Sequence, residues 1–343
     1  MQNTNPLLQT IKISISALLI LLFLVPAKAQ NNRIKEQTQG NDSSYIEWTG
    51  MYPPAEKIKK KTGIFRKISG VIIGSDELPS LVKPISVVAL SPDSFFVSDQ
   101  GSGVIFEVIN NTIAIPRNLR KKFVDMSSLV GMTFTPGHEI LFTDSRLGKI
   151  FKISSDRKKL EVLNDALILK QPTGIAYSIV NKEIWVVETA EHRIAILDEK
   201  GKLKKTIGKR GKGEGEFNFP TFISIDKAGN AYVTDAMNFR VEIFDKNGEF
   251  VSMFGEAGDA SGYFARPKGI ACDSYGHIYI VDALFHNVQI FDQNGNFLYQ
   301  FGHQGREKEE FWMPGGIFID AKDNIYVADS YNSRIQIFRL VSH

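Results

Sequence analysis

The sequence predicts an all-β protein: a six-bladed β-propeller of four-stranded antiparallel blades, closed by an N-terminal strand that completes the last blade. First, a short apolar segment that ends in an acid recurs six times. The acids are Asp99, Asp144, Glu188, Asp235, Asp282 and Asp329. Their spacings are 45, 44, 47, 47 and 47 residues. Second, apolar and polar residues alternate within each unit with the two-residue period of strands. Third, Asn and Gly separate these segments, as hairpin turns with positive φ require.

The first 29 residues have the layout of an export signal. Residues 13–25, ISISALLILLFLV, form an apolar run between Lys12 and the sequence Ala27-Lys28-Ala29. A basic start, a short apolar stretch and a small-x-small site are typical of a signal peptide. We therefore expect cleavage after Ala29, an extracytoplasmic (periplasmic or secreted) protein, and no stable membrane span after cleavage. The alternative is an uncleaved anchor, which would need about 20 apolar residues to span a membrane.

Residues 30–61 are predicted to be a polar leader or linker, and residues 62–343 the propeller. The leader contains Pro53-Pro54 and ends in three lysines, a composition typical of flexible or surface-lying segments. The whole chain has a net charge of +3, from 41 basic and 38 acidic residues. Removal of the two lysines of the export signal leaves 39 basic residues and a net charge of +1. So small a surplus argues against a nucleic-acid partner.

Each repeat has the pattern of four short strands, of which the first follows a proline. That proline lies 15 or 16 residues before the acid in five repeats, and Leu129 replaces it in the second. The prolines are Pro84, Pro172, Pro220, Pro267 and Pro314. In the fourth repeat we expect strands at 222–225, 231–234, 240–244 and 250–254. Four antiparallel strands repeated every 44–47 residues are typical of a propeller blade.

A closed ring needs a fourth strand for the last repeat, which ends after its third strand. Residues 64–69, IFRKIS, resemble the fourth strands of two later repeats, around Phe250 and Phe297. Because a propeller must not leave a sheet edge exposed, we expect residues 64–69 to complete the last blade.

The later repeats resemble NHL repeats. The relevant strings run from Gly211 to Pro220, from Pro267 to Ala283 and from Pro314 to Phe338. Four repeats match well, the first two are degenerate, and the resemblance covers about four-fifths of the chain. It implies a six-bladed propeller. NHL propellers serve as protein-interaction platforms, as RNA binders and, in some relatives, as enzymes, so the fold does not choose among these functions.

The six acids are expected to have a structural role. A catalytic group is needed once, whereas a residue that caps a turn is needed in every blade. An Asp at the end of a strand can accept hydrogen bonds from the backbone N–H groups of the loop that follows. Two of the six histidines, His192 and His286, lie at equivalent positions in these loops.

The resemblance also bears on metals. NHL-type α-amidating lyases hold zinc with histidines, some of which directly follow the proline that opens a blade. The corresponding residues here are Thr173, Thr221, Lys268 and Gly315, none of which offers an imidazole. We predict no cofactor for a binding protein. One divalent metal, calcium or zinc, is expected only under an enzymatic alternative.

The loops that follow the six acids are the candidate binding face. They share one end of a propeller with the links that lead into each blade, and they carry apolar, aromatic and basic side chains together. The candidate ligand-binding residues are Arg146, His192, Met237, Phe239, Lys268, Phe285, His286 and Tyr331. The alternative role for these side chains is packing between blades.

Two functions remain in view. The first is a non-enzymatic extracytoplasmic propeller that presents this face to a protein or glycan ligand. The second is a metal-dependent propeller lyase or lactonase with an active site at the channel mouth. The first is favoured because no nucleophile–base motif and no cluster of metal ligands is found in the sequence.

Overall fold

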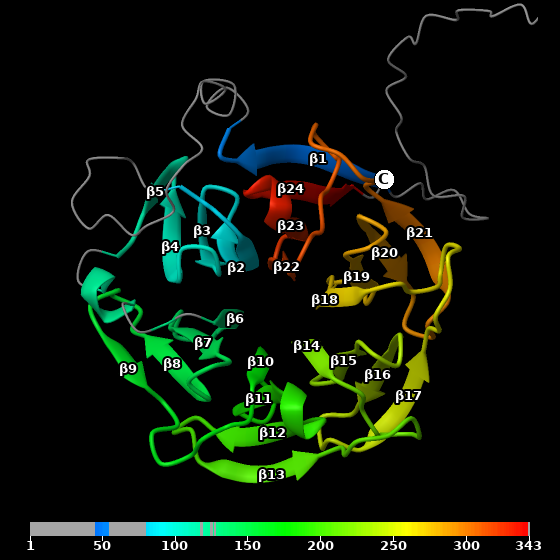
Figure 1. The fold of residues 1–343 in the computed structure, drawn as a ribbon, viewed down its shortest axis with the longest axis horizontal. Coiled ribbons are helices and arrows are strands. Elements are labelled where there is room, and N and C mark those ends of the chain that lie inside the picture. The colour runs from blue at the N-terminus through cyan, green and yellow to red at the C-terminus, as the bar shows by residue number, and fades with distance from the viewer. Residues whose placement is uncertain (1–44, 55–79, 117–118, 124–125, 127, 342–343) are drawn as a thin grey trace, which may run out of the picture. The chain divides into compact units, whose positions relative to one another are not determined.

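The computed structural model of the chain describes residues 45–54, 80–116, 119–123, 126 and 128–341. Contacts divide the chain into two units, Met1–Arg33 and Ile34–His343, and all described residues belong to the second. The predicted signal peptide and the predicted closing segment 64–69 lie outside the described residues. Within them, six four-stranded antiparallel sheets are arranged as the blades of a propeller (Figure 1).

In blades 1 to 5 the strands follow chain order from the centre of the ring outward. Blade 1 has β2 (Pro84–Ser91), β3 (Ser94–Asp99), β4 (Val104–Ile109) and β5 (Thr112–Ala114). Blade 2 has β6 (Leu129–Phe134), β7 (Ile140–Asp144), β8 (Lys149–Ile153) and β9 (Leu160–Val162). Blade 3 has β10 (Pro172–Ser178), β11 (Glu183–Glu188), β12 (Arg193–Asp198) and β13 (Leu203–Ile207).

Blades 4 and 5 repeat this plan closely. Blade 4 has β14 (Pro220–Ile225), β15 (Ala231–Asp235), β16 (Arg240–Phe244) and β17 (Phe250–Phe254). Blade 5 has β18 (Pro267–Cys272), β19 (Ile278–Asp282), β20 (Asn287–Phe291) and β21 (Phe297–Phe301). The four strands expected for the fourth repeat are confirmed to within two residues. Short 3₁₀ helices lie at η2 (Arg120–Phe123), η3 (Thr189–Glu191) and η4 (Ser330–Asn332).

Blade 6 is closed by a strand from early in the chain. Its sheet order is β1 (Tyr45–Tyr52), β24 (Arg334–Val341), β23 (Asn324–Asp329) and β22 (Ile317–Ile319). β1 pairs antiparallel with β24, and the Trp48 indole N–H donates to the Gln336 side-chain oxygen at 3.1 Å. Closure by an N-terminal strand is thus confirmed, but the segment that we predicted for it is wrong. Residues 45–52, which we assigned to the polar leader 30–61, occupy the outer edge of the blade.

The local sequence explains the strand boundaries. In blades 4, 5 and 6 the hairpin that follows the innermost strand begins with an aspartate whose Oδ1 accepts the backbone N–H four residues later. Asp226 does so for Asn230 at 2.8 Å, and Asp320 does so for Asn324 at 3.0 Å. The residue before each N–H donor has a positive φ that closes the turn, as at Gly229 (94°) and Asp323 (60°). Gly and Asp tolerate this conformation.

The hydrophobic core lies between neighbouring blades. In one cluster, Trp185 and Val187 of blade 3 pack against Phe217 and Val233 of blade 4. Trp185 and Phe217 are both fully buried. Each blade therefore needs both neighbours to cover its two faces. No helix among the described residues is long and apolar enough to cross a membrane.

All six innermost strands line a central cavity of about 170 Å³. Its walls consist of backbone and of mainly apolar side chains such as Ile175, Ile223, Ile270 and Phe318. Two titratable groups belong to this lining, Tyr177 and Cys272, and burial raises the pKa of the Cys272 thiol. The described lining of the channel thus contains no Asp, Glu, Lys, Arg or His side chain.

Candidate functional site

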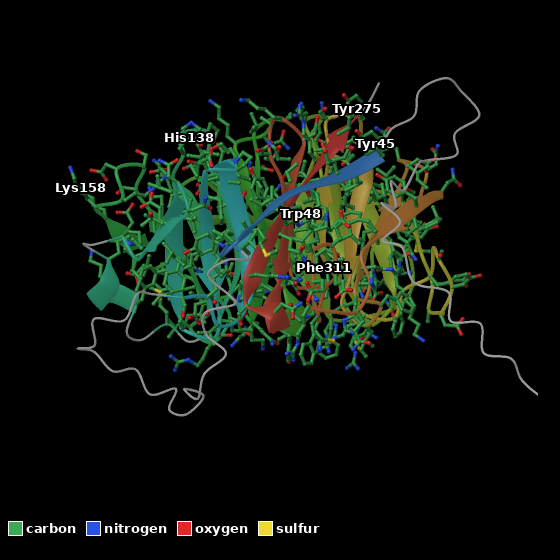
Figure 2. The ribbon with its side chains drawn as sticks, turned by 90° about the horizontal axis from the view of Figure 1, so that it is seen from above. Tyr45, Trp48, His138, Lys158, Tyr275 and Phe311 are labelled. Atoms are coloured by element: carbon green, nitrogen blue, oxygen red, sulfur yellow. The ribbon has the colours of Figure 1, made fainter. Side chains whose placement is uncertain are left out.

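The two ends of the ring are built from different turns. The hairpins that follow the first and third strands of each blade lie at one end. His138, Lys158 and Tyr275 belong to these hairpins and point outward on the upper side in Figure 2. The opposite end, here called the loop face, carries the links into each blade and the loops between second and third strands. Those loops are 100–103, 145–148, 189–192, 236–239, 283–286 and 330–333.

The six recurring acids hold the loop face together. Each is at most 1% exposed and accepts backbone N–H groups from the link before its blade. Asp282 accepts the Ala265 N–H at 2.8 Å, and it also accepts the Leu284 N–H of its own loop at 3.0 Å. Asp99 accepts the Lys83 N–H at 3.0 Å in the same way. The predicted cap of the loop that follows the acid is confirmed for Asp99, Asp144 and Asp282, which accept N–H groups of that loop. The acids of the other three blades instead bind the preceding link and the arginine of their own blade.

In three blades an arginine adds to this arrangement. Arg240 donates to Asp235 at 3.0 Å, and its guanidinium also reaches the carbonyls of Lys212 and Glu216 at 2.7 Å. Arg334 of blade 6 repeats the pattern with Asp329, at 2.7 Å. Arg240 and Arg334 are almost fully buried, so they fix the long links of the loop face and are not available to a ligand. In blade 3, Arg193 pairs with Glu188 at 2.7 Å, and its side chain is 34% exposed.

The two predicted histidines also have structural contacts. His192 and His286 are the last residues of their loops and have φ values of 54° and 57°. The His192 Nδ1 accepts the Phe219 N–H, and the His286 Nδ1 accepts the Met313 N–H, each at 3.0 Å. A ring nitrogen that accepts a hydrogen bond carries no proton, so Nε2 holds the hydrogen in the neutral ring. Burial lowers the pKa of His286, which favours this neutral form.

The second residue of each loop distinguishes one half of the loop face from the other. In blades 4, 5 and 6 this residue is Met237, Leu284 and Tyr331, exposed by 54%, 51% and 55%. In blades 1 to 3 it is Gly101, Arg146 and Ala190. Phe219, 42% exposed, lies in the link that leads into blade 4. We call Phe219, Met237, Leu284 and Tyr331 the apolar arc, because they come from consecutive blades.

The other predicted residues lie outside this arc. Phe239 is half-buried and packs against the core between blades 4 and 5. Phe285 is also half-buried, and Arg146 is exposed on the loop of blade 2. The structure therefore brings Met237 and Tyr331 together on one half of the face, and it adds Leu284 and Phe219, which we did not place among the candidate residues.

Three basic residues lie at the mouth of the channel on the same half. Lys83 and Arg266 directly precede the prolines that begin β2 and β18, and Lys268 is the second residue of β18. We call these three residues the cationic mouth. Burial, together with the charges of Arg266 and Lys83, lowers the pKa of Lys268 to about 8. None of the three has an ion-pair partner among the described residues.

Blade 6 has no side chain at the position equivalent to Lys268. It carries Gly315 there, and a Cβ on Gly315 would lie 2.8 Å from the Ser330 hydroxyl and 2.9 Å from the Ile85 side chain, so neighbouring side chains fill this position. The Gly269 N–H donates to the Gly315 carbonyl at 3.1 Å, so β18 and the start of blade 6 lie close together. No side chain of this position therefore separates Lys268 in blade 5 from Lys83 in blade 1.

Aromatic rings hold two of the basic side chains on this side. The Lys83 ammonium lies 5.7 Å from the centre of the Tyr331 ring. The Arg306 guanidinium lies 4.6 Å from the Trp312 ring, and the two rings are 6.3 Å apart. Lys83, Tyr331, Trp312 and Arg306 therefore follow one another in a row in which two cations flank two aromatic rings. Only Lys268 and Tyr331 of this neighbourhood were predicted. Lys83 and Arg266 could have been found from the sequence, because each directly precedes a proline that begins a blade.

The opposite end of the ring has a larger cavity, of about 450 Å³, between blades 2 and 3. Several of its charged groups have side-chain partners. The Tyr177 hydroxyl donates to Glu199 at 2.5 Å, and Lys152 pairs with Glu139 at 3.3 Å and with Glu161 at 3.0 Å. Lys182, which also lines this cavity, has no ion pair among the described residues.

The positions that the resemblance links to zinc do not fit a zinc site. The Thr173 hydroxyl contacts the Thr189 hydroxyl at 2.7 Å and donates to the Thr221 carbonyl at 2.8 Å. Lys268 and Gly315 offer no neutral nitrogen ligand of the kind that zinc prefers. Among the described residues, no three His, Cys, Asp or Glu side chains are placed to hold one metal ion.

Comparisons with known proteins support the fold. A family model described as a 6-bladed beta-propeller matches residues 159–231 and 271–343. No curated protein matches the chain. Virginiamycin B lyase from Staphylococcus aureus is 17% identical, with a TM-score of 0.55, over 77% of this chain and 98% of that one.

Two similar structures come from Bacteroides thetaiotaomicron. A structural genomics protein of unknown function is 12% identical over 78% of this chain and 72% of that one, with a TM-score of 0.60. An auxiliary nutrient binding protein is 12% identical over 76% of this chain and 70% of that one, also with a TM-score of 0.60. At these identities the likeness concerns the fold alone.

Proposed function

We propose that this six-bladed β-propeller is a non-enzymatic binding protein of NHL type that acts outside the cytoplasm and holds a protein or glycan ligand on its loop face. The observation that carries the proposal is the apolar arc. Three residues at equivalent loop positions in consecutive blades are each more than half exposed. Exposed apolar groups gathered on one side and bordered by charge mark binding surfaces.

The fold by itself does not choose this function. The structures that share it include a lyase and a nutrient binding protein, and one fold supports many activities. The surface of this chain supports binding because the buried acids, arginines and histidines of the loop face serve its own backbone. The exposed groups that remain, the apolar arc and the cationic mouth, are suited to contact. The export signal expected at residues 1–29 supports a location outside the cytoplasm.

Site-specific crosslinking tests the proposal. A photoreactive residue at Leu284, in the apolar arc, is compared with one at Lys246, an exposed position in a hairpin at the opposite end of the ring. We expect a crosslinked species in intact cells from position 284 and none from position 246. Equal crosslinking from both positions, or from neither, contradicts a ligand on the loop face.

Metal analysis tests the enzymatic alternative. Residues 30–343 are purified, gently desalted and analysed by mass spectrometry. About one calcium or zinc per chain, together with lyase or lactonase turnover that is lost when the metal is removed, would contradict the binding proposal.

A further inference from the structure

The cationic mouth is a site in its own right, because the charges of Arg266 and Lys83 act on Lys268 and none of the three has an ion-pair partner among the described residues. Lys83 and Lys268 come from blades 1 and 5, and the intervening blade 6 contributes only Gly315 at the equivalent position. The repeated acids of the same two blades, Asp99 and Asp282, are fully buried and accept backbone N–H groups. Cations that act on one another in this way are costly unless an anion joins them.

Lys83 is held by an aromatic ring instead of a carboxylate. The Tyr331 ring, 5.7 Å from the Lys83 ammonium, attracts the cation through its negative face. A contact of this kind restricts the lysine without neutralising its charge and leaves its N–H donors to an acceptor. Tyr331 is nevertheless 55% exposed, so it keeps free apolar surface and a hydroxyl beside the cations.

We propose that Lys83, Arg266 and Lys268 bind the carboxylate of an acidic sugar whose ring packs against Tyr331. This proposal rests on the proposed function, for which it names the class of ligand. A guanidinium and two ammonium groups are opposite in charge to a carboxylate and supply it with hydrogen-bond donors. A phenol offers apolar surface and a hydrogen-bonding group together, as required by a sugar ring with C–H groups and hydroxyls.

The observations favour a sugar acid over a nucleic acid. Single-stranded nucleic acids stack their bases on open aromatic faces along a basic groove. In this structure the three cations lie at one mouth instead of following a groove, which suits one compact anionic group.

Calorimetric titration with defined oligosaccharides tests the site. The probes are trigalacturonate, its neutral counterpart galactotriose, sodium sulfate and a trinucleotide, all at one ionic strength. For the unmodified protein we expect binding of trigalacturonate at least about tenfold tighter than that of the other three probes. Added salt should weaken binding because exposed charges are screened. Equal binding of sulfate would reveal a general anion site, and tighter binding of the trinucleotide would reveal a nucleic-acid site. Either result overturns the sugar assignment.

Matched variants locate the binding. Lys83→Met/Lys268→Met removes two charges from the mouth, and Lys227→Met/Lys246→Met removes two from hairpins at the opposite end. We expect the dissociation constant for trigalacturonate to rise about tenfold or more in the first variant and to stay unchanged in the second. The single variant Lys83→Met, at a partly exposed position, keeps the test valid if the double variant does not fold. Unchanged affinity in the mouth variants overturns the proposal.

Crosslinking separates this inference from the proposed function. A species crosslinked at position 284 that persists in excess trigalacturonate supports a loop-face ligand and overturns the acidic sugar. Loss of the crosslinked species in trigalacturonate, with retention in galactotriose, supports both. The absence of any crosslink at position 284 overturns the proposed function itself.

Discussion

One buried acid differs from its equivalents in the neighbouring blades. Glu242 occupies the position in β16 that Gln289 and Gln336 occupy in β20 and β24. The Gln289 amide donates to the Tyr263 carbonyl at 2.8 Å and accepts the Gly262 N–H at 2.8 Å. Glu242 forms an ion pair with Arg240 at 2.5 Å, but this charge and a hydrogen bond from the Gly215 backbone only partly offset the burial of its carboxylate.

Glu242 should therefore make stability depend on pH. Burial raises the pKa of Glu242 from 4.5 to about 8, so the folded protein holds a proton that the unfolded chain releases near pH 4.5. The folded state is favoured below that pH, and this contribution is lost as the pH rises through about 8. Glu242→Gln should raise the free energy of unfolding by about 1 kcal/mol or more. Thermal denaturation should show a larger gain at pH 9 than at pH 6. A gain that does not change with pH would show that Glu242 is not the titrating group.

The residues of the candidate site show what a sequence can and cannot reveal. Met237 and Tyr331 were recognisable because each stands at a fixed distance from a repeated acid. The proximity of Lys83 to Lys268 was not recognisable, because these residues are far apart in the chain and only closure of the ring brings blades 1 and 5 to either side of blade 6. His192 and His286 were predicted to bind a ligand because of their residue type and their place in the loops. Their contacts with Phe219 and Met313 depend on a backbone shape that the sequence does not display.

Among the elements, β1 has the largest consequence for the fold. It covers the outer edge of blade 6 and pairs with β24 along its length. Partly buried side chains, Ile46 and Trp48, pack against the core between blades 5 and 6, and Tyr52 is 6% exposed. Without β1 the edge of β24 would expose unpaired backbone groups, which invite pairing with other chains.

Truncation tests this role. A protein that begins at residue 55 lacks β1, whereas one that begins at residue 44 keeps it. We expect the first to lose at least about 3 kcal/mol of stability and to aggregate on concentration, and the second to melt close to the longer protein. Thermal denaturation and light scattering provide the measurement. Retention of the full melting temperature without β1 would contradict closure by this strand.

The strands of the blades were predictable and the closing strand was not, for a physical reason. Inner strands carry apolar residues at fixed distances from turns such as Asp226–Asn230, so pattern and turn chemistry agree. The outer strand of a blade faces solvent and pairs along one edge, so many segments with alternating residues suit it. Residues 64–69 share the pattern of other outer strands, but residues 45–52 also offer Ile46 and Trp48 for the gap beside blade 5.

At the scale of the molecule, the ring has no free end among the described blades. Blade 6 is joined to blade 1 by hydrogen bonds from the Ser330 hydroxyl to the Pro84 carbonyl, at 2.6 Å, and from the Ser333 hydroxyl to the Val82 carbonyl, at 2.7 Å. Every blade thus packs against two others. A linear array of repeats can lose its terminal units one at a time, whereas a closed ring can lose none without breaking two interfaces.

The propeller should therefore unfold in one step. Chemical denaturation is followed by far-ultraviolet circular dichroism, which reports all strands, and by tryptophan fluorescence, which includes the fully buried Trp185 of blade 3. We expect the two transitions to coincide, because loss of any blade exposes the core of its neighbours. In the protein without β1 the transitions should separate. Separate transitions in the closed ring would contradict this coupling.

The pairing of β1 with β24 also sets an order in time. Trp48 and Gln336, which share a hydrogen bond, are 288 residues apart. During synthesis β1 is made long before β24, so five blades can form while blade 6 still lacks β22, β23 and β24. The ring can close only when the last strand becomes available.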